Sequence, residues 1–229
     1  MTSNKKISKV ELSRFFSFAN KNSLKTAVYF TGGIIIFLAG TIMYGIILNL
    51  RESTLSEAMA EKGFKSLENP NLVVIRKAFM LQLYEDSVLI KTYRASFGKN
   101  LSTAKIKADD NATPVGEYAI CEIDSNHRYH RFLRINYPNI NDASEALRRG
   151  WITQKQFDKI KFEFYYEVCP KPDSVLGGNL GIHGIGKFNY IFKNLPFVYN
   201  WTNGSIAVSN EAIDEILSVV SKGTKVVIK

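Results

Sequence analysis

The chain has 229 residues, of which 45% are hydrophobic and 22% charged, an ordinary composition for a folded protein. Its formal net charge is +9, and residues 1–51 carry most of the excess, with seven Lys or Arg against a single Glu. Because this excess lies beside a hydrophobic run, it favours orientation in a membrane over nucleic-acid binding. We therefore predict no nucleic-acid partner.

The hydrophobic run covers residues 26–50 and has no charged residue between Lys25 and Arg51. About 20 apolar residues are enough for a helix to span a bilayer. Six Lys or Arg precede the run, so the positive-inside rule places the N-terminus in the cytoplasm and residues 52–229 outside. The run is longer than a signal-peptide core and no clear cleavage site follows, which predicts an uncleaved signal-anchor. The alternative is a buried core helix.

These features divide the chain into four predicted parts. Residues 1–25 form a basic cytoplasmic tail, 26–50 a single transmembrane anchor, 51–70 a polar juxtamembrane stalk, and 71–229 one exported domain. The domain is long enough to bury a sizeable core.

The exported part is rich in strand-like patterns. Apolar and polar residues alternate over 71–98, with the turn "YEDS" between two strands, and again over 117–123 and 130–138. Residues 98–116 are loop-like, and "TKVVIK" closes the chain as a strand. The glycine-rich stretch 177–186 predicts a strand and a turn.

Three helices are predicted between and after these strands. A helical insert covers residues 141–162, with Asp142 or Asn141 as its N-cap, Gly150 as a stop and Thr153 as a second cap. It is either a lid or a partner surface. Residues 209–223 form an amphipathic helix capped by Ser209. The sum is a mainly β domain with a few helices, preceded by one transmembrane helix.

Two residues form a candidate reactive pair. His183 lies in the glycine-rich stretch, where little side-chain cover is expected and a backbone can approach a ligand closely. Ser205 follows Gly204, which permits a tight turn whose N–H groups point at an oxyanion. An imidazole is a suitable proton acceptor for such a hydroxyl at neutral pH.

The cysteines and the other histidines give weaker signals. Cys121 and Cys169 are able to pair in an oxidising exterior, but their spacing does not decide it. The stretch "HRYH", from His127 to His130, resembles a ligand cluster, yet an exposed turn explains it better. We predict no metal site.

Four stretches carry a resemblance to a known family. They are "KADDNATPVGEYAI", similar to a TPxGxY loop, "HRFLRINYPNINDASEA", similar to an LxIxYPNxxD segment, "GGNLGIHG", similar to an IHG motif, and "NWTNGSIAVSNEAIDEI", similar to a WTxGCIAxSNxxxDE motif. In this order they resemble the catalytic domain of L,D-transpeptidases of the YkuD type, over residues 71–228. The resemblance implies a β-sandwich-like domain with a few helices, in the periplasm or cell-wall space. It also implies peptidoglycan stem peptides as substrates and no cofactor.

The resemblance also implies roles for single residues. His183 matches the base, Asn203 and Gly204 match the oxyanion turn, and Ser205 occupies the position of the family's nucleophilic cysteine. The family reaction is an acyl transfer in which a thiolate attacks the stem peptide, D-alanine leaves, and an amine or water takes the acyl group. The predicted substrate-binding residues are Gly184, Trp201, Thr202 and Tyr137.

The serine leaves several alternatives open. A hydroxyl is far less acidic than a thiol, so a serine at this position does not guarantee activity. Ser205 is a working nucleophile, a silenced position in a protein that only binds stem peptides, or a substitution that freezes an active enzyme. A hydrolase of the same substrates, a carboxypeptidase or amidase, is a further alternative. The sequence predicts no oligomeric state.

Overall fold

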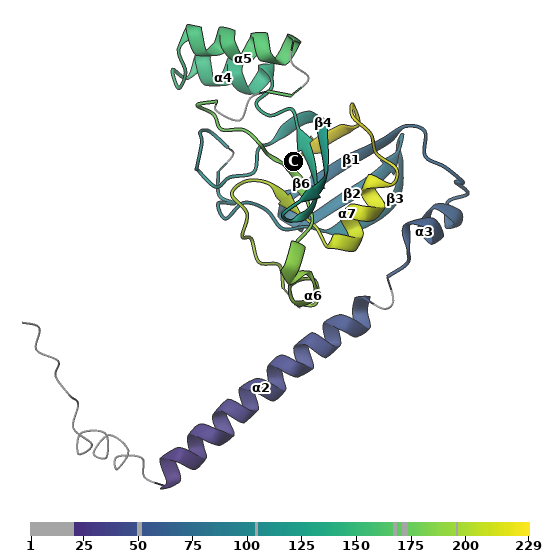
Figure 1. Ribbon diagram of the computed structural model, residues 1–229, viewed down its shortest axis with the longest axis vertical. Coiled ribbons are helices and arrows are strands. Elements are labelled where there is room, and N and C mark those ends of the chain that lie inside the picture. Colours follow the sequence, from purple (N-terminus) through teal and green to yellow (C-terminus); the bar gives the residue numbers. More distant parts are fainter. Residues whose placement is uncertain (1–20, 50–51, 104, 167–168, 171–173, 196) are drawn as a thin grey trace, which may run out of the picture.

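The computed structural model describes residues 21–49, 52–103, 105–166, 169–170, 174–195 and 197–229 (Figure 1). The predicted basic tail lies outside the described residues as far as residue 20. Helix α2 (Lys21–Asn49) contains an apolar stretch, Asn22–Ile47, that is long enough to cross a membrane and only 6% buried. This low burial excludes the core-helix alternative. A membrane anchor and a signal sequence share such a length, composition and position near the N-terminus.

A short helix, α3 (Leu55–Glu61), follows within the segment predicted as a stalk. Thr54 caps it, because its hydroxyl accepts from the Glu57 N–H while the Glu57 carboxylate accepts from the Thr54 N–H. Leu55 and Met59 are buried in the hydrophobic core of the domain. Part of the stalk segment therefore packs against the domain.

The domain is built on one eight-stranded mixed sheet with the order β3-β2-β1-β8-β4-β5-β6-β7. The pairs β1–β8 and β6–β7 are parallel, and the other neighbours are antiparallel. The strands are β1 (Pro70–Ile75), β2 (Met80–Glu85), β3 (Val88–Arg94), β4 (Gly116–His127), β5 (His130–Ile135), β6 (Gly181–His183), β7 (Ile206–Ala207) and β8 (Lys225–Ile228).

Alternating burial explains the first strands. In β1, Leu72 and Val74 are fully buried while their neighbours are half-buried, as the two-residue period of a strand requires. The predicted turn after β2 is confirmed. However, the run before it contains two strands rather than one, because a 3₁₀ turn (Arg76–Ala78) reverses the chain and Phe79 adopts a positive φ of 55°. Alternation alone did not reveal this reversal.

Strand β4 holds the sheet together. Its first half pairs with β8 and its second half with β5, so the two halves of the sheet are continuous. Helix α7 (Asn210–Leu217) packs near β5 and β6 and contributes buried Ile213 and Ile216 to the core. The predicted mainly β domain with several helices is therefore confirmed.

The predicted helical insert forms two paired helices, α4 (Ile140–Arg148) and α5 (Gln154–Tyr166), at the end of the domain farthest from α2 (Figure 1). The N-cap of α4 is Asn139 rather than Asn141 or Asp142. Asp142 instead closes a capping box, since its carboxylate accepts from the Asn139 N–H and its own N–H donates to the Asn139 side chain.

Other helix ends agree with the predictions. The Thr153 hydroxyl accepts from the Gln156 N–H, and Ser209 caps α7 through the Ala212 N–H. Gly150 follows the end of α4 with a positive φ of 71°. A short 3₁₀ turn (Gly186–Phe188) leads into helix α6 (Asn189–Phe192) on the side of the domain that faces α2 (Figure 1).

The two cysteines, whose pairing the sequence leaves open, form a disulfide. Cys121 in β4 is joined to Cys169, which lies a few residues beyond the end of α5. The bond fastens the chain leaving the helical insert to the middle of the sheet.

Candidate active site

The parallel pair β6–β7 brings the predicted base and nucleophile positions together. Ile182 is opposite Ile206 and His183 is opposite Ala207. Ser205 directly precedes β7, and its Oγ accepts a hydrogen bond of 3.3 Å from the Gly181 N–H at the start of β6. Residues 22 positions apart in the sequence thus meet across one strand pair.

The imidazole of His183 is held by its own neighbour in the chain. The ring is 3% exposed, and its Nδ1 lies 2.7 Å from the carbonyl oxygen of Gly184. Because a carbonyl only accepts, Nδ1 carries the proton and Nε2 is the basic nitrogen. This carbonyl is the orienting group for the histidine, and a backbone atom leaves no signature in the residue types.

Burial keeps this ring neutral. It lowers the pKa of His183 to about 4, and the nearby charges of His127 and Arg128 act in the same direction, while the hydrogen bond to Gly184 opposes them. At neutral pH the Nε2 lone pair is therefore free to accept a proton.

Aromatic rings surround the imidazole. Tyr129 stacks on His183 with 4.9 Å between ring centroids and 24° between planes, while Trp201 approaches it edge-on at 5.6 Å. The ring centroids of Phe132 and His127 each lie 6.3 Å from that of His183. The guanidinium of Arg128 lies over the ring of Tyr129, 4.7 Å from its centroid. The turn between β4 and β5, read in the sequence as a possible ligand cluster, thus packs around the candidate base.

The histidines of this turn have other partners. His130 Nε2 lies 2.7 Å from a carboxylate oxygen of Asp214 in α7. In the described part of the chain, no group of three His, Cys, Asp or Glu side chains is placed to hold a metal ion.

The turn before Ser205 is closed by Thr202. Its hydroxyl donates to the Ser205 carbonyl at 2.6 Å and accepts from the Gly204 N–H at 3.2 Å. The Gly204 N–H, one of the groups of this turn expected to face an oxyanion, thus has a partner within the turn. Asn203 is exposed and Trp201 is half-buried.

Gly204 cannot carry a side chain here. Its φ is +124°, and a Cβ at this position would lie 2.6 Å from the Ala112 carbonyl oxygen. The close approach of the loop before β4 therefore requires the glycine.

That loop is itself fastened to the turn region. Thr113 is fully buried and accepts from the Gly98 N–H at 3.0 Å, while Gly98 bridges to Thr202. The Asp110 carboxylate accepts from the N–H groups of residues 106, 107 and 112 and pairs with Lys105 at 2.8 Å. Burial raises the pKa of Asp110, but these hydrogen bonds outweigh it and the net pKa is lowered. The loop thus acts as a fixed support behind residues 202–205.

Tyr137 is placed elsewhere. It is 2% exposed, donates its hydroxyl to the Leu176 carbonyl at 3.0 Å and packs edge-on against Tyr118. None of its hydrogen bonds or ring contacts among the described residues involves His183 or Ser205. The structure thus gathers His183, Gly184, Trp201, Thr202, Gly204 and Ser205, and adds Gly181 and Tyr129, which the motifs did not single out as site residues.

A sequence model of the L,D-transpeptidase catalytic domain, also called YkuD, matches residues 70–228. The chain belongs to this family. The match spans the whole sheet and includes β6, β7 and the turn that carries Ser205. No curated protein is significantly similar in sequence.

Solved structures of the family are similar at low levels. An L,D-transpeptidase from Xylanimonas cellulosilytica is 16% identical over 77% of this chain and 70% of its own, with a TM-score of 0.42. The helical cell shape determining protein Pgp2 from Campylobacter jejuni is 17% identical, with a TM-score of 0.45. The match covers 77% of this chain but only 55% of the Pgp2 chain. Family membership therefore rests on the match over residues 70–228 and not on these similarities.

Proposed function

We propose that this protein is a membrane-anchored L,D-transpeptidase-like enzyme that acts on peptidoglycan stem peptides by acyl transfer in cell-wall remodelling. In this proposal α2 is the anchor, the N-terminus is cytoplasmic, and the domain from residue 71 onward works in the periplasm or cell-wall space. The carrying observation is the neutral, oriented imidazole of His183 on the strand next to Ser205.

The proposed chemistry follows from these groups. The Ser205 hydroxyl gives its proton to His183 Nε2 as its oxygen attacks the stem-peptide carbonyl. The backbone N–H of Ser205 stabilises the developing oxyanion, while the Gly204 N–H stays bonded to the Thr202 hydroxyl. The amide bond then breaks, D-alanine leaves with the proton from Nε2, and an ester joins the peptide to Ser205. An amine or water releases the acyl group and restores the hydroxyl.

A serine makes the first step more demanding than a cysteine would. A thiol with a pKa of about 8.5 reaches the thiolate state at neutral pH, whereas a hydroxyl has to lose its proton during attack. The Gly181 N–H, 3.3 Å from the Ser205 Oγ, favours this loss of the proton because it stabilises negative charge on the oxygen. Among the described residues, no hydrogen bond joins Ser205 to His183, an observation that favours the rival view of a binding protein without turnover.

The test is mass spectrometry of muropeptides incubated with the detergent-solubilised full chain, beside its Ser205→Ala and Ser205→Cys variants. We expect the unaltered protein to convert tetrapeptide stems and the alanine variant to be inactive. Cross-linked dimers or exchanged D-amino acids indicate transfer, and shortened stems indicate hydrolysis.

The remaining outcomes decide between the rivals. Product from the cysteine variant alone would show that the scaffold is competent and that the serine silences it, in favour of the binding protein. No product from any of the three would count against the family mechanism on these substrates.

A further inference from the structure

An exposed apolar surface lies apart from the reactive pair, on the segment around α6. We use the name aromatic segment for residues 188–195 and 197–199. Its large apolar side chains project into solvent: Phe188 and Tyr190 are 62% exposed, Phe197 60%, Tyr199 56% and Ile191 49%. Single exposed apolar residues are common, but a cluster of this kind marks an interaction surface.

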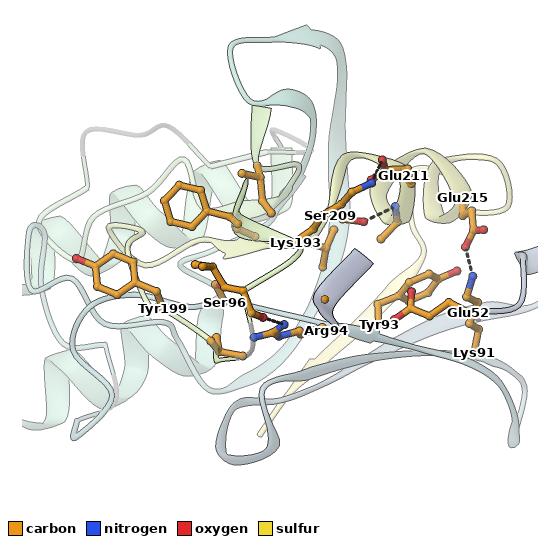
Figure 2. A pocket seen from close by; sticks show the side chains of 18 of the residues that line it. Glu52, Lys91, Tyr93, Arg94, Ser96, Lys193, Tyr199, Ser209, Glu211 and Glu215 are labelled. Atoms are coloured by element: carbon orange, nitrogen blue, oxygen red, sulfur yellow. Dashed lines mark hydrogen bonds and ion pairs between the residues drawn. The ribbon is translucent and has the colours of Figure 1, made fainter. Parts of the chain in front are cut away.

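The aromatic segment touches the end of α2. Gly45 has no room for a Cβ, because the backbone carbonyl of Asn194 lies directly against it. A cleft of about 610 Å³ is lined both by Tyr44 and Gly45 of α2 and by residues of the aromatic segment. Figure 2 shows two of the latter, Lys193 and Tyr199. Chain segments about 150 residues apart in the sequence thus meet at one place.

This contact sets the position of the aromatic segment relative to a bilayer crossed by α2. The apolar stretch of α2 ends at Ile47, two residues after Gly45. In a bilayer, the residues that pack against Gly45 therefore lie where the helix leaves the hydrocarbon. Aromatic side chains are enriched at this level, since their rings suit the boundary between acyl chains and head groups.

The segment is held to the domain by polar contacts on its inner side. The Arg94 guanidinium in β3 donates to the Leu195 carbonyl at 2.6 Å, and Lys193 pairs with Glu211 of α7 (Figure 2). The aromatic side chains are thus presented outward by a fixed support. Lys187 is exposed beside them, which suits contact with anionic lipid head groups.

Exposure alone does not identify such a surface. Phe162, Tyr165 and Tyr166 of α5 are equally exposed, but they lie at the opposite end of the domain from α2 (Figure 1). The position relative to α2 separates the two clusters and supplies a matched control.

We propose that the aromatic segment is a membrane-contact surface that inserts Phe188, Tyr190 and Phe197 into the outer interface of the bilayer crossed by α2. The proposal rests on the anchoring role given to α2 above, and not on catalysis by Ser205. With two contacts to the membrane, the domain has a fixed orientation. The ring of Trp201 lies 6.4 Å from that of Phe192 in the aromatic segment and 5.6 Å from that of His183, so this orientation also sets the distance of the reactive pair from the lipid.

The experiment places a fluorescent probe at single cysteines in the full chain. Both native cysteines are in the disulfide, so Tyr190→Cys, Tyr165→Cys and Ile36→Cys each add one reactive thiol at a well-exposed position. Each variant is labelled with NBD and reconstituted into vesicles of phosphatidylethanolamine and phosphatidylglycerol. The vesicles are prepared with and without a doxyl-labelled lipid, which quenches NBD only on contact with lipid.

We expect a blue-shifted emission and a loss of fluorescence in doxyl vesicles at positions 36 and 190, and neither at 165. Quenching at 36 without quenching at 190 would overturn the contact surface and leave the anchor intact. A blue shift at 190 without quenching would mean that protein covers the segment, which also overturns the proposal. No quenching at 36 would refute the anchor, and the contact surface would be refuted with it.

Discussion

At the scale of single residues, the environment of His183 has a consequence for stability. The folded protein keeps this imidazole neutral down to a pH of about 4, whereas in the unfolded chain it binds a proton below its ordinary pKa of 6.5. Between these values the unfolded state binds more protons, so the free energy of unfolding falls as the pH is lowered. The contribution is complete above pH 6.5 and is lost as the pH approaches 4.

We predict that His183→Asn removes this pH dependence. The asparagine amide keeps a donor for the Gly184 carbonyl but does not titrate. A pKa lowered from 6.5 to about 4 corresponds to about 3 kcal/mol between pH 7 and pH 4. Urea unfolding at several pH values, with the variant subtracted from the unaltered protein, measures this difference. Parallel curves for the two proteins would contradict the prediction.

A second prediction concerns the glycine before Ser205. Gly204→Ala should destabilise the protein by at least about 3 kcal/mol, because the strain of an unfavourable φ is added to a clash with the Ala112 carbonyl. The matched control is Gly63→Ala, since Gly63 also has a positive φ, of 81°, but nothing within 4 Å of a Cβ.

The control measures the cost of a positive φ in the absence of a clash. Strain alone should cost the Gly63 variant about 1 kcal/mol. Thermal or urea unfolding of both variants measures the two losses. Equal losses would show that the loop before β4 yields to the new methyl group.

At the scale of elements, a disulfide joins the helical insert to the sheet in addition to the packing of its buried residues, such as Ala146 and Ile160, in the core. The α4–α5 pair is inserted between β5 and β6, and the Cys121–Cys169 disulfide closes a loop of 48 residues around it. Cross-linking a loop of this size restricts the unfolded chain and stabilises a protein by typically about 2–4 kcal/mol.

We therefore predict that the double variant Cys121→Ala with Cys169→Ala loses about 2–4 kcal/mol in the free energy of unfolding. Alanine avoids a polar group at Cys121, which is 4% exposed. Urea unfolding with and without a reductant is the measurement. The reductant should lower the midpoint of the unaltered protein to that of the variant and leave the variant unchanged. An unaltered protein whose midpoint ignores the reductant would argue against a stabilising bond.

At the scale of the whole molecule, the two ends of the domain differ in their position relative to α2. The α4–α5 insert lies at one end of the domain, and α6 faces α2 at the other (Figure 1). In the proposed arrangement, with α2 as the membrane anchor, the insert points away from the lipid. The disulfide, which persists in oxidising compartments, agrees with an exported domain.

The sequence by itself determined what depends on local pattern. The apolar stretch of α2, most strands and the caps Thr153 and Ser209 follow from periodicity and from the chemistry of neighbouring residues. The ordered motifs led to the family. Local pattern failed at Asn139. The N-cap is the last residue with an extended backbone before the helix, and where that residue falls does not depend on residue type alone.

Only the tertiary structure decided what depends on strand pairing and packing. The register of β6 with β7 sets Ser205 beside Gly181, and the Gly184 carbonyl that orients His183 is a backbone atom. Packing placed Tyr129 on the imidazole, buried Tyr137 in the core and brought the aromatic segment to the end of α2. These contacts join segments far apart in the chain, and residue periodicity carries information only about neighbours in the sequence.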